Sequence, residues 1–442
     1  MKKIKILFFA ILLIITLLWL TADTFLSQDF LFFAVRSSLI SYTGLIGIGV
    51  MSIAMILALR PVFMEPVTGG LDKTYRLHKW LGITGLVISI MHWLLVKAPK
   101  WMIGWGMLER PARGPRPEQT NSIFIFFQEQ RGLAESIGEW AFYAVVILLS
   151  LALIKKFPYK HFFKTHRLLP IVYLFLVFHS VVLTPFYYWN QAIAPVMAIL
   201  MLGGTVAAII SLSRKVGYHR KAIGEITQLE YFTDNRVLSI DIKLLSHWRG
   251  HQTGQFAFVT FDKDEGAHPF TISSSWNNDG HINFMVKGLG DYTNAMPRTL
   301  KKGDLASIEG PYGRFMFNGD KPRQIWIGGG IGITPFIARL QKLSTEKHNQ
   351  IIHLFYSTSA PQEDFIERLR KLAEKAKVTL HVIVSGKDPR LNADRICNIV
   401  PDWQTADIWF CGPAGFGKSL KKDMIQKGLS EDDFHQELFN MR

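Results

Sequence analysis

The stretch "RLHKWLGITGLVISIMHWLL", residues 76–95, is an apolar run long enough to cross a bilayer, and it carries two histidines, His78 and His92. A span needs about 20 apolar residues. An ionisable side chain inside a bilayer is costly and therefore indicates a functional site. The two histidines are 14 residues apart, which is about 21 Å along a helix and within about 40° on one face. The pattern predicts one membrane helix with an imidazole near each end of the same face.

The run is one of six apolar segments, at about 4–22, 38–59, 78–96, 136–154, 167–184 and 191–212. Together they predict a six-helix membrane bundle. Lys and Arg cluster at the chain start and at every second boundary, so the positive-inside rule places both termini in the cytoplasm. A signal peptide is the alternative for the first segment, but no small-x-small cleavage site follows it. The external loop 97–135 contains "SIFIFFQEQRGLAESI", for which we expect an amphipathic helix on the membrane surface.

The charge of the chain has the distribution of a membrane protein. Of 442 residues, 50 are Lys or Arg and 35 are Asp or Glu, giving a net charge of +15. Much of the excess flanks the apolar runs, which argues against nucleic acid as a partner. The two cysteines, Cys397 and Cys411, both lie in the C-terminal half. They imply no disulfide framework and fit a reducing compartment.

A second apolar segment also carries a pair of histidines. "HRLLPIVYLFLVFH" holds His166 and His179, 13 residues apart on a segment of the same direction. We expect two layers: His78 with His166 near the cytoplasm, and His92 with His179 near the outside. Two neutral imidazoles facing each other across a bundle are a natural axial pair for haem iron. The alternative is that they are packing or interfacial histidines.

The second pair does not fit an ideal helix. Thirteen residues leave its two histidines about 140° apart. Pro170 has no N–H to donate to the carbonyl four residues earlier, so we expect the helix to kink or re-wind there.

Residues 218–318 read as short β segments with turn signals, which predicts a small β-barrel. It contains "HPFTISS" (268–274), "VKGLGDYT" (286–293) and "EGPYGRF" (309–315). Small residues let backbone N–H groups approach a pyrophosphate, and hydroxyls add donors for a flavin. The candidate flavin-binding residues on these grounds are Thr271, Ser273, Ser274, Gly288, Gly290 and Thr293.

Residues 321–442 alternate strand and helix. "RQIWIGGGIGITPFIARLQKL" reads as a buried strand, a glycine turn and an amphipathic helix whose N-terminus faces an anion. We expect Thr334 to cap that helix and Pro335 to occupy its first turn. The candidate residues for a nicotinamide nucleotide in this turn are Gly328, Gly329, Gly330, Gly332, Thr334 and Pro335.

Taken together, these motifs resemble the ferric reductase and NADPH oxidase superfamily, over nearly the whole chain from about residue 38. The resemblance implies three domains: a transmembrane di-haem domain (1–217), an FAD-binding β-barrel (218–320) and an α/β NAD(P)H-binding domain (321–442) of the ferredoxin-reductase type. It implies that the four histidines hold two b-type haems. It adds His268, Pro269, Phe270 and Lys287 to the flavin candidates. It also places Cys411, Gly412 and Pro413 beside the nicotinamide ring and a terminal aromatic, here Phe439, against the flavin.

The resemblance implies an oxidoreductase in which electrons pass from cytoplasmic NADPH or NADH through FAD and both haems to an external acceptor. We expect dioxygen, reduced to superoxide. A ferric-chelate reductase is the alternative, and a quinone or a periplasmic protein remains open as acceptor. Two other classes are a membrane-anchored flavin reductase and a haem redox sensor. We expect a multi-pass protein of a bacterial inner membrane with cytoplasmic soluble domains and no obligatory protein partner. Arg390 or Arg395 could provide the charge for NADPH, so the nucleotide preference stays open.

Overall fold

The computed structural model of the protein describes residues 1–23, 25, 31–109, 121–154, 156–319 and 321–437. The chain divides into two compact units. The first comprises Met1–Gly69 and Lys73–Val216, and the second comprises Gly70–Asp72 and the described residues from Gly217 onward. Each unit is described by itself below.

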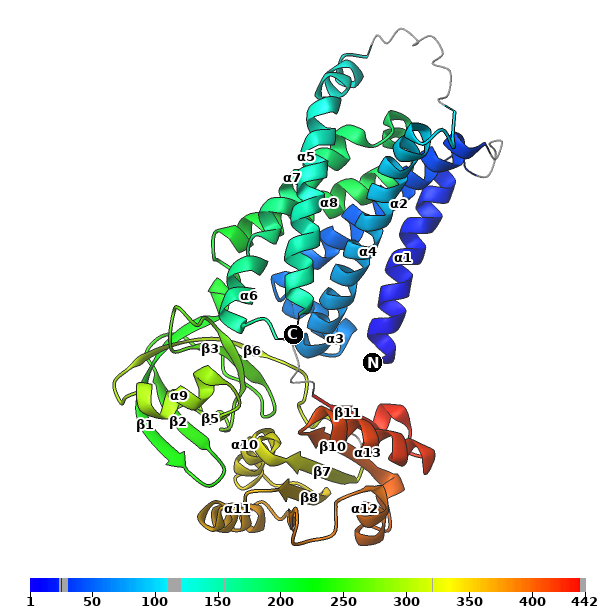
Figure 1. Ribbon diagram of the computed structural model, residues 1–442. Helices are drawn as coiled ribbons and strands as arrows, with labels where there is room; N and C mark the ends of the chain where they lie inside the picture. The colour runs from blue at the N-terminus through cyan, green and yellow to red at the C-terminus, as the bar shows by residue number, and fades with distance from the viewer. Residues whose placement is uncertain (24, 26–30, 110–120, 155, 320, 438–442) are drawn as a thin grey trace. The chain divides into compact units, whose positions relative to one another are not determined.

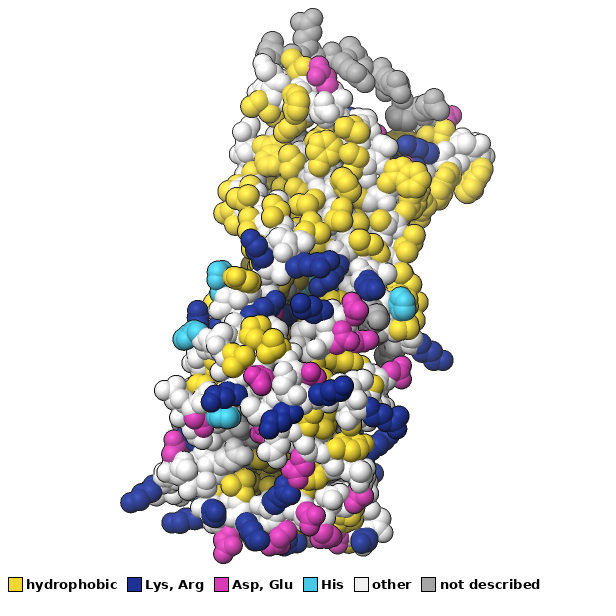
Figure 2. Space-filling view, turned by 90° about the vertical axis from the view of Figure 1, so that its left-hand side faces the viewer, with side chains coloured by type: hydrophobic (Ala, Val, Ile, Leu, Met, Phe, Trp, Pro, Cys, Tyr) yellow, Lys and Arg dark blue, Asp and Glu magenta, His cyan; other side chains and the backbone are white. Residues whose placement is uncertain are grey.

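The first unit is a helical bundle (Figure 1). Its long helices are α1 (Lys2–Ala22), α2 (Phe32–Ala58), α4 (Leu71–Gly104), α5 (Ser122–Leu153), α7 (Leu169–Leu183) and α8 (Ile193–Leu212). With α6 (Tyr159–His166) joined to α7, six helical segments of the described chain are long and apolar enough to cross a membrane. Figure 2 shows hydrophobic side chains covering the visible outside of this bundle, as lipid contact requires.

The expected surface helix at 122–137 is wrong. Those residues form the N-terminal half of α5, one continuous helix of 32 residues. The Asn121 side chain accepts hydrogen bonds from the N–H groups of Ile123 and Phe124 and so begins the helix there. No proline interrupts α5, and the amphipathic segment therefore continues into the apolar one.

Helix α4 also extends beyond the expected segment, to Gly104, and passes through Pro99. Proline lacks an N–H, so the carbonyl four residues earlier loses its helical partner. That carbonyl belongs to Leu95, and the Arg36 Nε of α2 donates to it at 2.7 Å. An inter-helix bond thus replaces the missing one.

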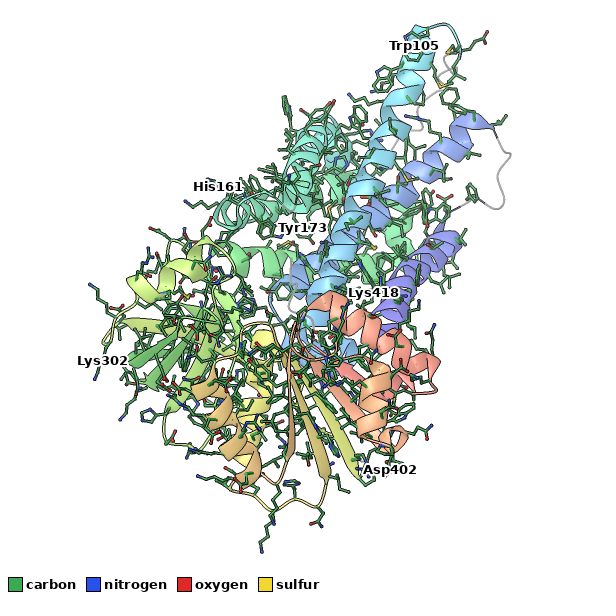
Figure 3. The ribbon with its side chains drawn as sticks, turned by 60° about the horizontal axis from the view of Figure 1, so that its bottom comes forward. Trp105, His161, Tyr173, Lys302, Asp402 and Lys418 are labelled. Atoms are coloured by element: carbon green, nitrogen blue, oxygen red, sulfur yellow. The ribbon has the colours of Figure 1, made fainter. Side chains whose placement is uncertain are left out.

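Polar contacts inside the bundle tie α2, α7 and α8 together. The Tyr173 hydroxyl, which Figure 3 places within the bundle, lies 2.8 Å from Ser52 Oγ and donates to the Met201 carbonyl at 3.3 Å. A side chain at Gly204 would meet the Tyr173 hydroxyl at 2.0 Å. The glycine therefore makes room for the buried phenol.

The second unit begins with a six-stranded antiparallel sheet in the order β4-β3-β6-β1-β2-β5. The strands are β1 (Lys221–Phe232), β2 (Val237–Leu244), β3 (Phe256–Thr260), β4 (His268–Thr271), β5 (His281–Lys287) and β6 (Leu305–Tyr312). A bridge between Ile272 and Phe284 joins the two edge strands and closes the sheet into a barrel. Helix α9 (Asp291–Thr299) follows β5.

A five-stranded parallel sheet completes this unit, in the order β11-β10-β7-β8-β9. Its strands are β7 (Arg323–Gly329), β8 (Ile351–Thr358), β9 (Thr379–Val384), β10 (Ala406–Cys411) and β11 (Phe434–Gln436). The helices of this part are α10 (Thr334–Leu343), α11 (Glu363–Lys375), α12 (Ala393–Ile399) and α13 (Ala414–Gln426). The expected β-barrel and α/β folds are confirmed. The domain limits 1–217, 218–320 and 321–442 stay a prediction.

Candidate functional site

The bundle brings the four histidines together in two facing pairs. The ring centroids of His78 and His166 are 6.0 Å apart, and those of His92 and His179 are 6.3 Å apart. The pairing requires the break between α6 and α7. Helix α6 ends at His166 and α7 restarts at Leu169 with Pro170 in its first turn. The expected interruption at Pro170 is therefore confirmed, and it lets both histidines of this segment face α4.

Hydrogen bonds hold three of the four rings by their Nδ1 atoms. His78 Nδ1 lies 2.9 Å from the Ala54 carbonyl, and His179 Nδ1 lies 2.8 Å from the Ala134 carbonyl. These contacts need an Nδ1–H, which leaves Nε2 as the free lone pair. His166 Nδ1 has no hydrogen-bond partner among the described residues.

The third ring, His92, is held by a hydroxyl. Its Nδ1 lies 3.0 Å from Thr43 Oγ1, whose own hydrogen can go to the Leu39 carbonyl at 2.7 Å. The hydroxyl oxygen is then free to accept from the imidazole. Metal-bound histidines typically donate their second ring N–H in this way, which fixes the tautomer and the ring orientation.

The spacing of the pairs fits an ion held between two imidazoles. A metal midway would lie about 3 Å from each centroid, half of the 6.0 and 6.3 Å separations. This is a metal–nitrogen bond of about 2 Å plus the radius of the ring. Two ligands alone do not make a protein metal site, and no group of three or more ligating side chains occurs among the described residues. The pairs suit haem, because the porphyrin supplies the other four nitrogens.

Small residues give the outer pair its room. A Cβ at Gly138 of α5 would lie 2.0 Å from His179 Nδ1, and one at Gly44 of α2 would lie 3.5 Å from His92 Cε1. Thr43, Gly138 and the carbonyls of Ala54 and Ala134 were not among the candidates from the sequence. Their only sequence signal is a small or hydroxyl residue on an apolar helix.

The barrel brings the predicted flavin residues into neighbouring strands. His268, Pro269, Phe270 and Thr271 form β4, which pairs with β3. The His268 ring stacks on Tyr292 with centroids 4.8 Å apart. Burial lowers the pKa of His268 and raises that of Tyr292 to about 12, so both rings are neutral near pH 7.

Three predicted hydroxyls have structural partners in the barrel. Ser273 Oγ accepts from the Met285 N–H at 3.1 Å, and Ser274 Oγ accepts from the Asn283 N–H at 3.0 Å. Both bonds tie the end of β4 to β5. Thr293 Oγ1 accepts from the N–H groups of residues 289 and 290, at 2.9 and 3.1 Å. It thus orders the turn in which the predicted Gly288 and Gly290 lie.

The glycine turn lies where the strand order reverses. β7 has β8 on one side and β10 on the other, and ligands of open α/β sheets bind at the carboxyl ends of strands around such a point. A Cβ at Gly332 would meet the Cys411 carbonyl at 2.2 Å, and one at Gly329 would meet Pro413 Cδ at 2.8 Å. Only bare backbone lets the two turns pack this closely.

The turn brings together further predicted residues. Gly330 has φ +56, and a Cβ there would lie 3.9 Å from Lys287 Nζ, so a cation of the barrel reaches the turn. Pro335 occupies the first turn of α10 as expected. The predicted cap at Thr334 is wrong: the 3-10 turn at Gly330–Ile333 runs directly into the helix, and Thr334 Oγ1 donates back to the Ile331 carbonyl at 3.1 Å.

Cys411 ends β10 and is fully buried. Burial, together with the Glu437 carboxylate, raises the pKa of its thiol well above the ordinary value. The thiol stays protonated, which excludes a thiolate nucleophile and leaves a small neutral group beside Gly412 and Pro413.

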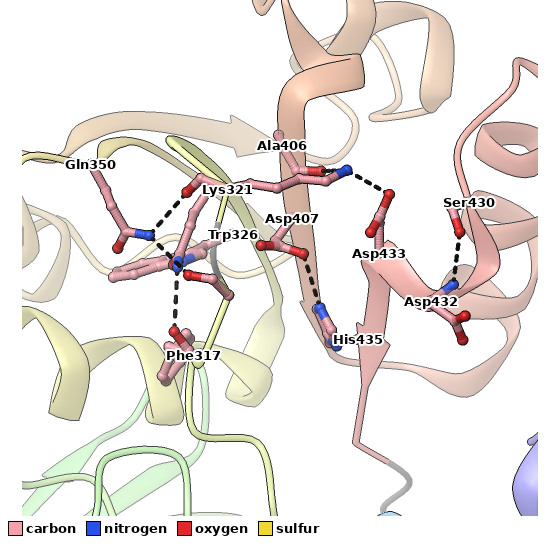
Figure 4. Close-up of polar contacts among 12 residues, drawn as sticks. Phe317, Lys321, Trp326, Gln350, Ala406, Asp407, Ser430, Asp432, Asp433 and His435 are labelled. Atoms are coloured by element: carbon pink, nitrogen blue, oxygen red, sulfur yellow. Dashed lines mark hydrogen bonds and ion pairs between the residues drawn. The ribbon is translucent and has the colours of Figure 1, made fainter.

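Strand β11 brings Glu437 close to Cys411 at the end of β10. It pairs with β10, and the His435 Nε2 lies 3.2 Å from Asp407 Oδ1 (Figure 4). The His435 ring also stacks on Trp409, with centroids 4.0 Å apart. Glu437, next to β11, is buried. Phe439 lies outside the described residues.

Comparison with protein families gives two matches on this chain. Residues 43–177 match the description "Ferric reductase like transmembrane component", and residues 226–317 match "Oxidoreductase FAD-binding domain". The first match contains all four paired histidines, and the second contains β4.

Individual relatives cover parts of the chain. Flavohemoprotein B of Dictyostelium discoideum is 26% identical over 192 residues, 38% of this chain and 44% of that protein. The electron transfer component of toluate 1,2-dioxygenase from Pseudomonas putida is 23% identical over 244 residues, 53% of this chain and 70% of that protein. The chain spans about half the length of several such relatives. Among solved structures, an Amycolatopsis cytochrome P450 reductase has a TM-score of 0.45 at 17% identity, over 50% of this chain and 70% of that one.

Proposed function

We propose that this chain, which joins a ferric reductase-like transmembrane domain to an FAD-binding reductase module in the architecture of ferric reductases and NADPH oxidases, carries electrons from NAD(P)H across a membrane to dioxygen. The observation that supports this best is the pair of facing histidine layers, at 6.0 and 6.3 Å, within the transmembrane match. Such layers provide two haem positions, one above the other, in a chain that also has a flavin module. The protein belongs in this proposal to a bacterial inner membrane, with its soluble domains in the cytoplasm.

Each cofactor in this proposal has candidate binding residues in the chain. His78 and His166 would hold the inner haem, and His92 and His179 the outer one. The β4 motif around His268 would hold FAD, and the turn at Gly328–Gly332 would hold the nicotinamide nucleotide. Bound FAD and haem would supply hydride acceptance and one-electron transfer, respectively. The protein contributes ring orientation at the histidines, a protonated thiol at Cys411 and an apolar bundle that excludes water.

Dioxygen is the acceptor we favour because His92 and His179, if both held the outer haem, would leave no open position on its iron. An acceptor there must react at the haem edge, which suits a small neutral molecule. Ferric-chelate reduction is the second candidate, favoured by the description of the transmembrane match.

The test uses the purified full chain in detergent or nanodiscs. We expect b-type haem bands that appear on NAD(P)H addition, and superoxide formation that superoxide dismutase suppresses. His92→Ala should keep the inner haem reducible but stop external electron delivery. His161→Ala, on the same helix as His166 but in neither layer, is the matched control. Absence of haem bands would refute the relay, and faster reduction of a ferric chelate than of dioxygen would select the second candidate.

A further inference from the structure

At the level midway between the two histidine layers, α4 carries a glycine, which has no side chain. Gly85 is seven residues from His78 and seven from His92, and each step of seven returns to within about 20° of the same helix face. A glycine therefore stands midway between the two ligands, on the face that carries both. A Cβ at Gly85 would lie 3.5 Å from Met51 Cγ and 3.6 Å from Met51 Cε. The methionine of α2 thus lies against the space that the glycine leaves open.

The helices opposite α4 present short side chains at the same level. Val145 of α5 follows Gly138, which contacts His179, by seven residues. Val172 of α7 lies between His166 and His179 in the sequence. Both valines are buried, and Met51 packs against the cluster they form. Met51 also packs against the separate cluster around α2 and α8. Among the described residues, Met51 is the one methionine of this middle layer, which contains Gly85, Val145 and Val172 and in which Leu86, Leu148 and Leu176 also pack.

We propose that Met51 bridges the two haem sites and carries the electronic contact between them. This inference rests on the proposed function, because it needs both haems. Electron tunnelling weakens less steeply through packed, bonded atoms than across a gap, and Met51 supplies such atoms at the midpoint. Its thioether is polarizable and uncharged, so it adds contact without favouring an electron on either site. One electron leaves the inner site and one arrives at the outer site. Met51 itself is neither oxidised nor reduced.

A simple packing role makes different predictions from a bridging role. A packing residue, when shortened, lowers haem content or thermal stability. A bridging residue, when shortened, slows transfer between haems that are both still bound and have unchanged midpoint potentials. Met197 of α8 is the matched control, because it is a buried methionine in the α2 and α8 cluster and has no place in the middle layer.

The experiment uses the full chain in nanodiscs with NAD(P)H and an excess of external ferricyanide. Haem content, the two midpoint potentials and the reduced haem fraction during turnover are measured for Met51→Ala, Met51→Leu and Met197→Ala. We expect Met51→Ala to keep two haems and unchanged potentials, to turn over several-fold more slowly, and to hold one of the two haems reduced during turnover. Met51→Leu, which fills the same space without sulfur, should behave nearly as the unmodified chain, and Met197→Ala should too.

Two results would overturn the bridge. One is an unchanged turnover and reduced fraction in Met51→Ala with both haems bound. The other is a loss of haem from Met51→Ala, which would make Met51 a packing residue. Neither result touches the proposed function, which fails only if the unmodified chain lacks haem bands or external electron delivery.

Discussion

At the scale of single residues, the hydrogen-bond partners of the imidazoles matter as much for the orientation of the rings as the histidines themselves. The oxygen atoms at Ala54, Thr43 and Ala134 hold three rings by Nδ1. They belong to α2 and α5, neither of which carries one of the four paired histidines. The ligand geometry therefore depends on residues that have no metal chemistry of their own.

Gly138→Ala tests this dependence. The added methyl would lie 2.0 Å from His179 Nδ1, so the ring must leave the position in which it faces His92. We expect the variant to retain one haem per chain instead of two, measured as the pyridine haemochrome. Gly132→Ala, on the same helix with nothing within 4 Å of the added Cβ, should retain both. Two haems in Gly138→Ala would show that the outer site does not need this glycine.

The sequence predicted the four histidines but not their surroundings. Spacing along one helix follows from its period, so the faces of His78 and His92 can be calculated. Which residue of another helix lies opposite depends on how the helices pack, and a single sequence holds no signal for that. The hydroxyls of Ser273, Ser274 and Thr293 show the same limit, because their backbone partners are set by the closure of the barrel and the turn.

At the scale of elements, the interruption between α6 and α7 was predictable from a failed fit to an ideal helix. The sequence pattern did not exclude the expected surface helix at 122–137. Amphipathicity shows which face of a helix is apolar, but it does not show where the helix ends. The helix start at Asn121 and the lack of a proline decided its length.

Pro170→Ala tests the interruption. An alanine restores the N–H that the His166 carbonyl lacks and removes a ring that costs a helix interior about 3 kcal/mol. The segment should then straighten and rotate His166 away from His78. We expect loss of the inner haem with the outer one retained, read as haem content and as loss of NAD(P)H-driven reduction. Pro195→Ala, in the first turn of α8, is the control, and intact haem content in Pro170→Ala would contradict the expectation.

The loop before β3 gives the barrel a sensitivity to acid. His251 Nε2–H donates to the Ser274 carbonyl at 2.9 Å, and its Nδ1 accepts from Trp248 at 3.4 Å. Burial lowers the pKa of His251 from 6.5 to about 4. Between these two values His251 is protonated in the unfolded chain and neutral in the folded chain. The contribution of His251 to the free energy of unfolding is therefore fully present above pH 6.5, and it falls by about 1.4 kcal/mol per pH unit towards pH 4.

FAD release can report this loss. We expect flavin fluorescence to rise as the pH is lowered from 6.5 to 4.5 at constant temperature, and His251→Gln to flatten the dependence in that window. His247→Gln, an exposed residue of the same loop, should leave the dependence unchanged. An equal slope in His251→Gln would assign the acid sensitivity to other groups.

At the scale of the whole molecule, the order of motifs along the chain predicted the order of folds. A bundle, a barrel and a parallel sheet follow one another as the apolar segments, the short β segments and the strand-helix alternation indicated. The tail was different, since β11 joins β10 through only three paired residues and "HQELFNMR" carries no periodic pattern. The contact of Phe439 with a flavin stays a prediction.

The sidedness of the molecule is open to a direct test. The basic boundaries predict that the nucleotide domain lies in the cytoplasm. NAD(P)H does not cross membranes, so we expect it to reduce haem in inside-out vesicles and not in right-side-out vesicles until detergent is added. Dithionite-reduced haem in both preparations serves as the control for protein content. Reduction in sealed right-side-out vesicles would reverse the orientation.

The Nδ1 contacts also bear on when the two proposed haems would enter during biogenesis. The four proposed ligands come from α4 and from the α6 and α7 segment, while the atoms that orient three of them come from α2 and α5. A chain that has inserted its helices one by one, without associating them, presents imidazoles that are free to rotate. Haem capture should therefore be a late maturation step that follows assembly of these helices, and a bundle that fails to assemble would be delivered to proteolysis without its cofactor.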